Sequence, residues 1–475
     1  MSSMNTERTE HSEAMCSLAQ ATAWIDGASV RGDAARAFTR VHTDSRTAAP
    51  GDLFVALKGE RFDAHDFLPE VVARGVAAVL VAREPGLDVP AIVAPDTRLA
   101  LGALAAGWRR RFHLPTVAVT GSNGKTTVKE MIAAIFAAAV GAEQRLATGG
   151  NLNNDIGLPL TVLRLRAQHR LAVLELGMNH PGETVYLAGI AQATVAVITN
   201  AQREHQEFMV SVEAVAREHA AAIAALPADG VAVIPHDAEG GSAHAPIWRE
   251  AAGARRVLSF GLATGADVGA EIRLEDGVQC LQVRSPAGAF EVRLPLLGAH
   301  NARNALGAIA CALAAGVEVA AIQRGLAGFS AVKGRLQVKH GRRGELVIDD
   351  SYNANPDSVR AAIDVLAGFA TPRLLVLGDM GEVGDQGVPF HAEVGAFARE
   401  RGIGALWATG ELATHAVQAF GPGGRHFARA EDLLQALAAD EEGVVTRAAA
   451  VLVKGSRFMR MERMVDALVG SPIAQ

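Results

Sequence analysis

The chain has 475 residues, of which 49% are apolar and 5% aromatic, and its formal net charge is −6. This length predicts about three domains, and the mild charge, with no long basic block, makes nucleic acid an unexpected partner. The three cysteines are widely spaced and fit neither a metal pattern nor a disulfide framework, and no apolar run approaches a membrane span or a signal-peptide core. We therefore expect a cytoplasmic protein without membrane insertion.

The N-terminal region, residues 17–112, has the pattern of a small α/β domain. It follows a polar leader, residues 1–16, that we expect to be disordered. Strands are predicted at 53–57, 77–81 and 91–94, and helices at 67–73 and 96–112. Asp44, Ser45 and Arg46 precede a turn, and such residues are most often plain turn residues. The alternative is a polar-ligand site at strand ends.

The sequence TGSNGKTT at 120–127 lies between an apolar run and a helix predicted from the apolar spacing that follows. Strand, glycine-rich turn and helix bind phosphate, because unpaired N–H groups and the helix dipole meet at the helix start. Gly121 and Gly124 allow close backbone approach, Lys125 can reach terminal phosphates, and Thr126 can offer its hydroxyl to Mg²⁺. The usual four residues between the glycines are two here, so a chance turn before a helix is the alternative interpretation.

Residues 113–328 and 329–475 are predicted to be two further α/β domains. Strands at 171–176, 195–199 and 231–234 alternate with helices, as in a parallel sheet covered on both faces. A period of two between 271 and 297 predicts an added antiparallel meander, and a helix is expected at 301–315. Strands at 345–348, 374–377, 405–408 and 450–453 make the last domain doubly wound and Rossmann-like. The predicted fold class is thus α/β, with a central phosphate-loop domain between the other two.

Two polar residues follow predicted strands of the central domain. Glu175 ends one strand, where an acid beside a phosphate loop can hold Mg²⁺. A solvated strand-end carboxylate is an equally good interpretation. His205 lies in a polar loop after the next strand, and a lone histidine is more often an ordinary polar contact.

Two amide-rich stretches also occur in the central domain. Asn151 and Asn154 lie in a glycine-rich loop, which chemistry alone does not assign. Asn301 could be a helix cap. A cap does not account for the neighbouring polar residues His300 and Asn304.

The third region has the densest polar strand end. Asp350, Tyr352, Asn353 and Asn355 stand close together before a proline, and we favour a binding role over a turn. Arg335 and Lys454, near other strand ends, suit anionic groups.

Taken in order, these motifs resemble the Mur ligase family of peptidoglycan synthesis, over residues 43–462. The matching pieces are TDSR at 43–46, GDLFVALKGERFDAHDF at 51–67, TGSNGKTT at 120–127, GNLNNDIGLP at 150–159, ELG at 175–177, GAHNARN at 298–304, GR at 334–335, DSYNANPDS at 350–358, GDM at 378–380 with Glu382 and His391, and KGSR at 454–457. Their order and spacing make them specific together. The strings YNANP and LGDM are most similar to the member that adds D-alanyl-D-alanine.

The resemblance implies an ATP-dependent amide ligase that joins D-alanyl-D-alanine to the C-terminal carboxylate of UDP-N-acetylmuramoyl-tripeptide through an acyl phosphate. It implies ATP and Mg²⁺ as cofactors and these two molecules as substrates, and we expect a monomer. The implied catalytic residues are Lys125, Glu175 and His205, and the implied metal ligands are Thr126, Glu175 and His205. The implied ATP site comprises Gly121, Ser122, Asn123, Gly124, Lys125, Thr126, Thr127, Asn301, Asn304, Arg335 and Asp350. The implied substrate site comprises Asp44, Ser45, Arg46, Asn151, Asn154, Tyr352, Asn353, Asn355 and Lys454.

The chain departs from the family pattern at one position. Many Mur ligases carry a carbamylated lysine beside the second magnesium, in a segment read A-x-A-K-x-E, and the aligned stretch here, residues 216–221, has His219 in place of that lysine. A lysine carbamate is therefore excluded at this position. We hypothesise that Glu204, Glu218 or His219 takes over its role.

Two other functions stay open from the sequence. A folylpolyglutamate-synthase-like ligase would share the fold and the phosphate loop, but the N-terminal segment and the YNANP string argue against it. A nucleotide-dependent switch or scaffold would need only the phosphate loop and would leave the polar strand ends of the third region unexplained. The sequence does not fix whether the third residue of the tripeptide is diaminopimelate or lysine.

Overall fold

The structure, a computed structural model, describes residues 13–204, 207–275 and 278–470. The chain forms two compact units. The first contains residues 1–114, 146–170 and 186–192, and the second contains residues 115–145, 171–185 and 193–475. Among the described residues, no helix has the length and apolar character that a bilayer crossing requires.

The first unit is built on a five-stranded sheet with the order β2–β7–β6–β5–β4. Its strands are β2 (Ser29–Arg31), β7 (Ala91–Val93), β6 (Ala78–Val81), β5 (Asp52–Val55) and β4 (Arg40–His42). β4 to β7 run parallel, and β2 is antiparallel to β7. Around it lie the pair β1 (Cys16–Ser17) and β3 (Ala37–Phe38) and the helices α1 (Leu18–Thr22), η1 (Ala64–Phe67), α2 (Leu68–Ala73), α3 (Thr97–Arg109) and α5 (Gly157–Val162). β5 and β6 are buried at every position, as parallel strands covered on both faces are.

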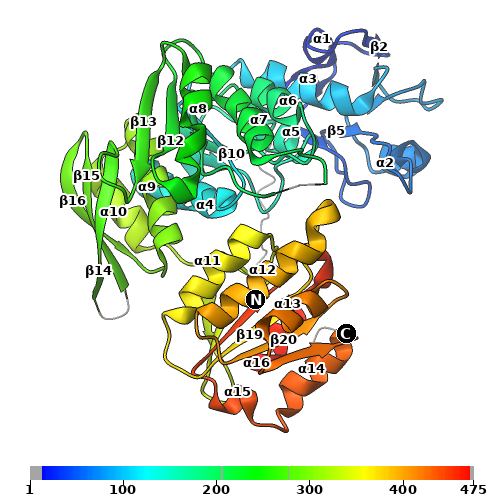
Figure 1. Ribbon diagram of the computed structural model, residues 1–475. Helices are drawn as coiled ribbons and strands as arrows, with labels where there is room; N and C mark the ends of the chain where they lie inside the picture. Colours follow the sequence, from blue (N-terminus) through cyan, green and yellow to red (C-terminus); the bar gives the residue numbers. More distant parts are fainter. Residues whose placement is uncertain (1–12, 205–206, 276–277, 471–475) are drawn as a thin grey trace, which may run out of the picture. The chain divides into compact units, whose positions relative to one another are not determined.

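A nine-stranded sheet, whose strands belong to the second unit except for the last two residues of β9, carries the phosphate loop (Figure 1). In order across the sheet, its strands are β16 (Gly288–Leu294), β15 (Val278–Ser285), β14 (Val268–Glu275), β13 (Arg256–Gly261), β12 (Val231–Pro235), β11 (Val195–Ile198), β8 (Thr116–Thr120), β10 (Leu171–Glu175) and β9 (Arg145–Ala147). β8 is parallel to both β10 and β11, and its register pairs Val119 with Glu175 and Thr120 with Ile198. The carboxyl ends of these three buried strands therefore share one edge.

Helices surround this sheet. They are α4 (Lys125–Val140), η2 (Ala142–Gln144), α7 (Val212–Ala224), η3 (Ala238–Gly240), η4 (Ser242–His244), α8 (Ala245–Ala252), α9 (Ala299–Ala314) and α10 (Val319–Ala327). α6 (Glu183–Ala191) is divided between the two units. α4 contacts α9, α10 and β10, so the helix that follows the phosphate loop is held on several sides.

The second unit also contains a six-stranded sheet with helices on both faces (Figure 1). In order, its strands are β17 (Gln337–His340), β18 (Leu346–Asp350), β22 (Ala450–Lys454), β19 (Arg373–Gly378), β20 (Ala405–Thr409) and β21 (Gly424–Phe427). Its helices are α11 (Pro356–Ala367), η5 (Gly384–Gln386), α12 (Gly387–Glu400), α13 (Ala413–Phe420), α14 (Ala430–Ala439), α15 (Val444–Arg447), η6 (Arg457–Met459) and α16 (Glu462–Val469). Only β17 is antiparallel to its neighbour.

The alternation of side chains along β19 explains this layering. Leu375 and Leu377 belong to one buried cluster, which includes residues of α11 to α13, whereas Leu374 and Val376 belong to a second, which includes residues of α14 to α16. Successive side chains of a strand point to opposite faces, so an apolar residue at every position requires cover on both. This is the doubly wound arrangement that the sequence predicts.

The structure contains each strand and helix that the sequence analysis predicts, with ends shifted by a few residues. The antiparallel meander is β14 to β16, although residues 276 and 277, which connect β14 to β15, lie outside the described residues. Residues 1–12 of the predicted leader also lie outside them, whereas Met15 and Cys16 are buried and Cys16 begins β1, ahead of the predicted start at residue 17. The domain boundaries at 112/113 and 328/329 stay predictions.

Candidate active site

The loop between β8 and α4 can be built only with glycine at two positions. Gly121 has a φ of +129° and Gly124, the N-cap of α4, a φ of +84°. A Cβ on Gly121 would lie 2.1 Å from Oγ1 of Thr199, and one on Gly124 would lie 2.5 Å from Oδ1 of Asn304. The backbone N–H groups at the start of α4 therefore face a loop without side-chain bulk, which is the geometry of a phosphate cradle.

Lys125, the first residue of α4, folds its side chain back over this loop. Its Nζ donates to the carbonyl oxygens of Gly121 and, at 3.1 Å, Ser122, and it lies 3.3 Å from Oε2 of Glu204. All three partners of the Lys125 ammonium are oxygen atoms in or beside the phosphate loop. The ammonium is thus placed where it can exchange these oxygens for those of a bound phosphate.

Thr126 and Glu175 come together as the sequence predicts. The Thr126 hydroxyl donates to Oε1 of Glu175 at 3.2 Å, and Glu175, the last residue of β10, is buried. A hydroxyl and a carboxylate are the hard oxygen donors that Mg²⁺ prefers, usually with phosphate and water oxygens completing its shell. Within the described residues, no three His, Cys, Asp or Glu side chains gather as a metal site formed by protein ligands alone would need. The predicted third ligand, His205, lies outside the described residues.

The segment after β11 fixes the loop from the other side, an arrangement that the motifs in the sequence do not predict. Oδ1 of Asn200 accepts the Asn123 N–H at 2.8 Å, and Oγ1 of Thr199 donates to the Asn123 carbonyl at 2.7 Å. The N–H of Gln202 donates to Oγ of Ser122 at 2.9 Å. The only signal in the sequence is a polar run directly after a buried strand.

Glu204 joins His219 to the phosphate loop. Nε2 of His219 lies 3.0 Å from Oε1 of Glu204, and Nδ1 lies 2.9 Å from the hydroxyl of Thr120, the last residue of β8. His219 is fully buried, and this burial lowers its pKa despite the nearby carboxylate. Glu218 instead accepts the N–H groups of Gly182 and Thr184, at 3.0 and 2.8 Å. Of the three predicted substitutes for the lysine, Glu204 and His219 are therefore at the loop and Glu218 is bound at the start of α6.

Helix α9 brings Asn304 to the loop, as its predicted role requires. Oδ1 of Asn304 lies beside Gly124, and its Nδ2 lies 3.5 Å from Oδ1 of Asn301. The interpretation of Asn301 as a helix cap is wrong. α9 begins earlier, with Gly298 as its N-cap, and Asn301 lies inside the helix with its Nδ2 donating to the Leu297 carbonyl at 2.8 Å.

The polar strand ends of the six-stranded sheet meet in one cluster. Nζ of Lys454 lies 2.5 Å from Oδ2 of Asp350 and donates to the Asn353 carbonyl at 2.9 Å. Burial raises the pKa of Asp350 and lowers that of Lys454, and in each case the charged partner opposes the shift. The guanidinium of Arg335 lies 4.1 Å from the ring centre of Tyr352. The structure thus gathers the predicted residues of this region.

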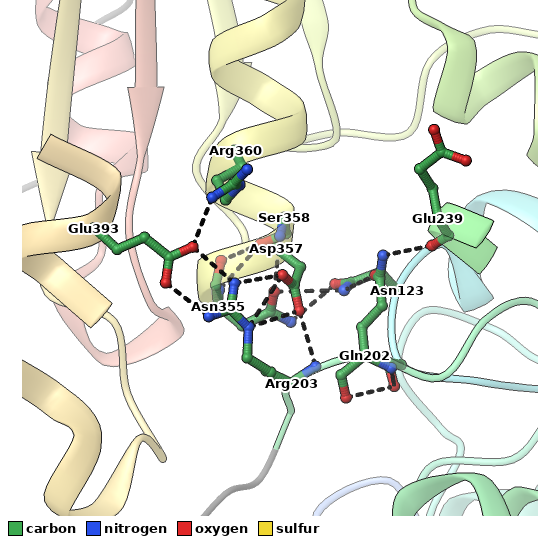
Figure 2. A network of polar contacts seen from close by, with 10 residues as sticks. Asn123, Gln202, Arg203, Glu239, Asn355, Asp357, Ser358, Arg360 and Glu393 are labelled. Carbon is green, nitrogen blue, oxygen red and sulfur yellow. Dashed lines mark hydrogen bonds and ion pairs between the residues drawn. The ribbon is translucent and has the colours of Figure 1, made fainter. Parts of the chain in front are cut away.

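Asn355 links that cluster to the phosphate loop (Figure 2). It is the N-cap of α11, and with Ser358 it forms a capping box. Its Nδ2 also donates to Oδ1 of Asn123 at 2.9 Å. The YNANP string therefore reaches the phosphate loop by a direct hydrogen bond.

The remaining predicted substrate residues belong to the first unit. Asp44 and Arg46 form an ion pair at 2.7 Å, which holds the pKa of Asp44 well below its usual range, and Ser45 lies between them in sequence. Oδ1 of Asn154 accepts the Gly157 N–H at 2.9 Å at the start of α5, so this residue has a structural role in addition to any binding. Asn151 is exposed.

Three family models match the chain. The Mur ligase family, catalytic domain, matches residues 37–109, the Mur ligase middle domain matches 119–312, and the Mur ligase, glutamate ligase domain, matches 334–457. UDP-N-acetylmuramoyl-tripeptide–D-alanyl-D-alanine ligase of Escherichia coli K12 is 40% identical over 432 residues, which cover 90% of this chain and 93% of that protein. A crystal structure of MurF from Acinetobacter baumannii matches with a TM-score of 0.89 at 37% identity, covering 97% of this chain and 99% of that chain.

Two structures with bound nucleotide also match. MurF ligase from Thermotoga maritima, in complex with ADP, has a TM-score of 0.78 at 26% identity and covers 90% of this chain and 96% of that chain. Folylpolyglutamate synthase from Mycobacterium tuberculosis, complexed with ADP and AMPPCP, has a TM-score of 0.61 at 21% identity and covers 79% and 95%. That identity shows the fold alone. The predicted α/β fold class with three domains is confirmed.

Proposed function

This chain belongs to the Mur ligase family, and we propose that it is the ATP-dependent ligase that joins D-alanyl-D-alanine to the C-terminal carboxylate of UDP-N-acetylmuramoyl-tripeptide in peptidoglycan precursor synthesis. The observation that carries the proposal is the hydrogen bond between Asn123 and Asn355. It joins the phosphate loop to the polar strand end that a simple nucleotide switch would not need. The 40% identity to a ligase of this name supports the same assignment.

The residues at the loop fit ATP and Mg²⁺. The glycine-only cradle suits the phosphates, and the paired oxygens of Thr126 and Glu175 suit the metal. Mg²⁺ held there would neutralise charge on the phosphates during transfer. Asn304, beside Gly124, and Arg335 complete the proposed nucleotide site. We place His205 in the metal site as well, from the family resemblance.

The phosphate loop would act in the first of two chemical steps, the transfer of the γ-phosphoryl group. A carboxylate is a poor electrophile, so its oxygen first attacks the γ-phosphorus of ATP, giving an acyl phosphate and ADP. The free amine of D-alanyl-D-alanine then attacks the acyl carbon, and the carbon–oxygen bond to phosphate breaks. Lys125 and the N–H groups at the start of α4 stabilise the charge on the transferred group electrostatically, because they are held in fixed positions.

The remaining site residues are proposed to bind the two substrates that the enzyme joins. In our proposal Asp44, Ser45 and Arg46 contact the UDP end, with Asn151 and Asn154 nearby in the tripeptide path. Tyr352, Asn353, Asn355 and Lys454 contact the nucleotide substrate and the incoming dipeptide. The Asp350–Lys454 pair is buried, and Lys454 also holds the Asn353 carbonyl, so the pair fixes the strand end that carries Tyr352, Asn353 and Asn355. We further propose that the protein works as a monomer in the cytoplasm, where its three buried cysteines stay reduced.

Phosphate release from ATP tests the proposal. We expect release only when UDP-N-acetylmuramoyl-tripeptide and D-alanyl-D-alanine are both present, with one joined product by mass spectrometry. Parallel assays with the diaminopimelate and lysine forms of the tripeptide identify the accepted form. Phosphate release that is indifferent to both substrates would favour the switch, and release supported by a folate and glutamate would favour the folylpolyglutamate-type ligase.

A further inference from the structure

We propose that Arg203 is a positioning residue for the ligase reaction, because it clamps the start of α11, and with it Asn355, to the segment that supports the phosphate loop. Arg203 lies in the polar segment after β11, between Gln202 and Glu204. Its guanidinium contacts two acids, Asp357 on α11 and Glu393 on α12 (Figure 2). Both helices pack on the six-stranded sheet, and we call this sheet with its helices the six-stranded part.

The contacts of Arg203 are numerous and well directed. Nη2 lies 2.6 Å from Oδ1 of Asp357 and 3.0 Å from Oε1 of Glu393, and Nη1 lies 2.7 Å from Oε2 of Glu393. The backbone N–H of Arg203 also donates to Oδ2 of Asp357 at 2.9 Å. The three side chains are only 22–30% exposed, so this pairing is shielded from solvent and salt more than a surface ion pair is. The guanidinium also lies 5.0 Å from the ring centre of Phe390.

Both sequence neighbours of Arg203 contact the phosphate loop, so its ion pairs connect that loop to α11 and α12. The residue before it, Gln202, accepts a hydrogen bond from Nδ2 of Asn123 at 2.7 Å, and the residue after it, Glu204, pairs with Lys125. Asp357 lies two residues after Asn355, which bonds to Asn123. The segment 202–204 therefore touches the phosphate loop on either side of a residue that binds α11 and α12.

The reaction requires this attachment. An acyl phosphate formed at the phosphate loop must meet an amine held, on our proposal, by residues of the six-stranded part. If Arg203 is lost, the substrates themselves must draw the two parts together, which uses binding free energy otherwise available for affinity. Nucleotide affinity depends less on that attachment, because the phosphate loop and Asn304 form most of the proposed nucleotide site, and Arg335 and Asp350 are its contribution from the six-stranded part.

Arg203→Met tests the inference, which rests on the proposed function for its kinetic arm. We expect the KM for D-alanyl-D-alanine to rise about tenfold or more, kcat to change much less, and the dissociation constant of a non-hydrolysable ATP analogue to change less than about twofold. Arg203→Lys, which keeps the charge but loses the two-pronged geometry, is expected to fall between Arg203→Met and the wild type. A merely structural role would lower the active fraction, and hence kcat, without raising KM.

Arg360→Met is the matched control. Arg360 lies on α11 and pairs with the same Glu393 at 2.8 Å, but this pair stays within the six-stranded part (Figure 2). We expect its kinetic constants to stay near those of the wild type. If Arg203→Met does not fold, Asp357→Asn and Glu393→Gln remove the same contacts one at a time and are expected to raise the same KM.

A distance measurement separates the inference from the proposed function. Spin labels on Glu250→Cys and Glu400→Cys, both exposed, report on the nine-stranded and six-stranded parts, and the three native cysteines are buried. We expect Arg203→Met to broaden the distance distribution and Arg360→Met to leave it unchanged. Identical distributions and identical KM values in the two variants would overturn the role of Arg203. Failure of the wild type to need both substrates would instead overturn the proposed function.

Discussion

Glu204 contacts both His219 and Lys125 at the phosphate loop. Its two oxygens lie 3.0 Å from Nε2 of His219 and 3.3 Å from Nζ of Lys125. His219 occupies the position where many Mur ligases carry a modified lysine. Its hydrogen bond to Glu204 holds the carboxylate of that residue beside the phosphate loop. We propose that this pair, and not Glu218, takes over the metal-supporting role.

Magnesium titration tests this assignment. Glu204→Gln and His219→Ala are expected to raise the Mg²⁺ concentration needed for half-maximal activity by about tenfold, because removal of one supporting group typically costs 10–100-fold in metal affinity. Mg²⁺ binding in the presence of a non-hydrolysable ATP analogue, followed by calorimetry, is expected to weaken in parallel.

Glu218→Ala is the control for that titration. Glu218 accepts two N–H groups at the start of α6, so its loss is expected to lower the melting temperature while the Mg²⁺ dependence stays the same. An unchanged Mg²⁺ dependence in all three variants would exclude the substitution hypothesis. A change in Glu218→Ala alone would reassign the role to that residue.

His300 predicts a pH dependence of stability. Burial, with the charges of Arg303 and Lys454 nearby, lowers the pKa of His300 to about 4, and its Nε2 has no hydrogen-bond partner within the described residues. Below pH 6.5 this histidine binds a proton in the unfolded chain but not in the folded chain. The free energy of unfolding therefore decreases as the pH falls from 6.5 to the folded pKa. The full shift would remove about 2 kcal/mol at pH 5, and because the residue as a whole is only partly buried we expect about 1 kcal/mol.

Urea unfolding at pH 7 and pH 5 measures this effect. His300→Gln is expected to lose less stability between these pH values than the wild type does, by the same amount. Other buried histidines, such as His219 and His391, have lowered pKa values and contribute to both proteins alike. Equal losses in the two proteins would show that His300 keeps an ordinary pKa.

The positions of residues could be predicted where a motif fixes them locally. Lys125, Thr126 and Glu175 follow from a loop of known geometry and a strand end beside it, and the structure brings them together. Asn200 and Gln202 could not be predicted, since their hydrogen bonds join segments about eighty residues apart. The sequence suggests Asn301 as the cap of α9 because the true cap, Gly298, has no side chain to mark it.

At the scale of elements, the strand, loop and helix around residues 116–140 form a unit that depends on backbone conformation. Gly124→Ala is expected to weaken nucleotide binding by about tenfold or more, because the new Cβ would strain a positive φ and meet Oδ1 of Asn304 at the phosphate cradle. Nucleotide titration followed by calorimetry measures the loss.

Gly141→Ala is the matched control at the other end of α4. Gly141 has a φ of +93°, and no atom lies within 4 Å of an added Cβ. Both variants cost stability, about 1–3 kcal/mol each from backbone strain. Only Gly124→Ala is expected to lose affinity, and an equal loss in Gly141→Ala would show that strain in α4, rather than contact at the cradle, controls binding.

The elements predicted best are the buried parallel strands. β8, β10 and β12 are continuous apolar runs because both of their faces are covered. β13 and β17 were missed, since RVLSFG and QVKH mix polar and apolar residues without a clear period. The GDM string has a local structural role: Asp379 accepts the Ala413 N–H at 2.7 Å, and the Met380 N–H donates to Nε2 of His391 at 2.9 Å.

At the scale of the whole molecule, sequence predicts three α/β regions because each has its own alternation of strands and helices. The cross-connections between regions are not visible in that pattern. Arg203 with Asp357 and Asn123 with Asn355 are pairs of ordinary polar residues more than 150 positions apart, and only the fold identifies them as partners. These pairs join the phosphate loop to a second polar region. They therefore favour a ligase, which must bring two reactants together, over a nucleotide switch, which needs only the phosphate loop.

Transfer of an oxygen isotope tests the central claim most directly. UDP-N-acetylmuramoyl-tripeptide labelled with ¹⁸O in its C-terminal carboxylate is incubated with ATP, Mg²⁺, D-alanyl-D-alanine and the protein, and the released phosphate is analysed by mass spectrometry. The account predicts one ¹⁸O atom in each phosphate, because the carboxylate oxygen that attacks the γ-phosphorus leaves with it when the amide forms. Phosphate that carries no ¹⁸O would contradict an acyl-phosphate ligase.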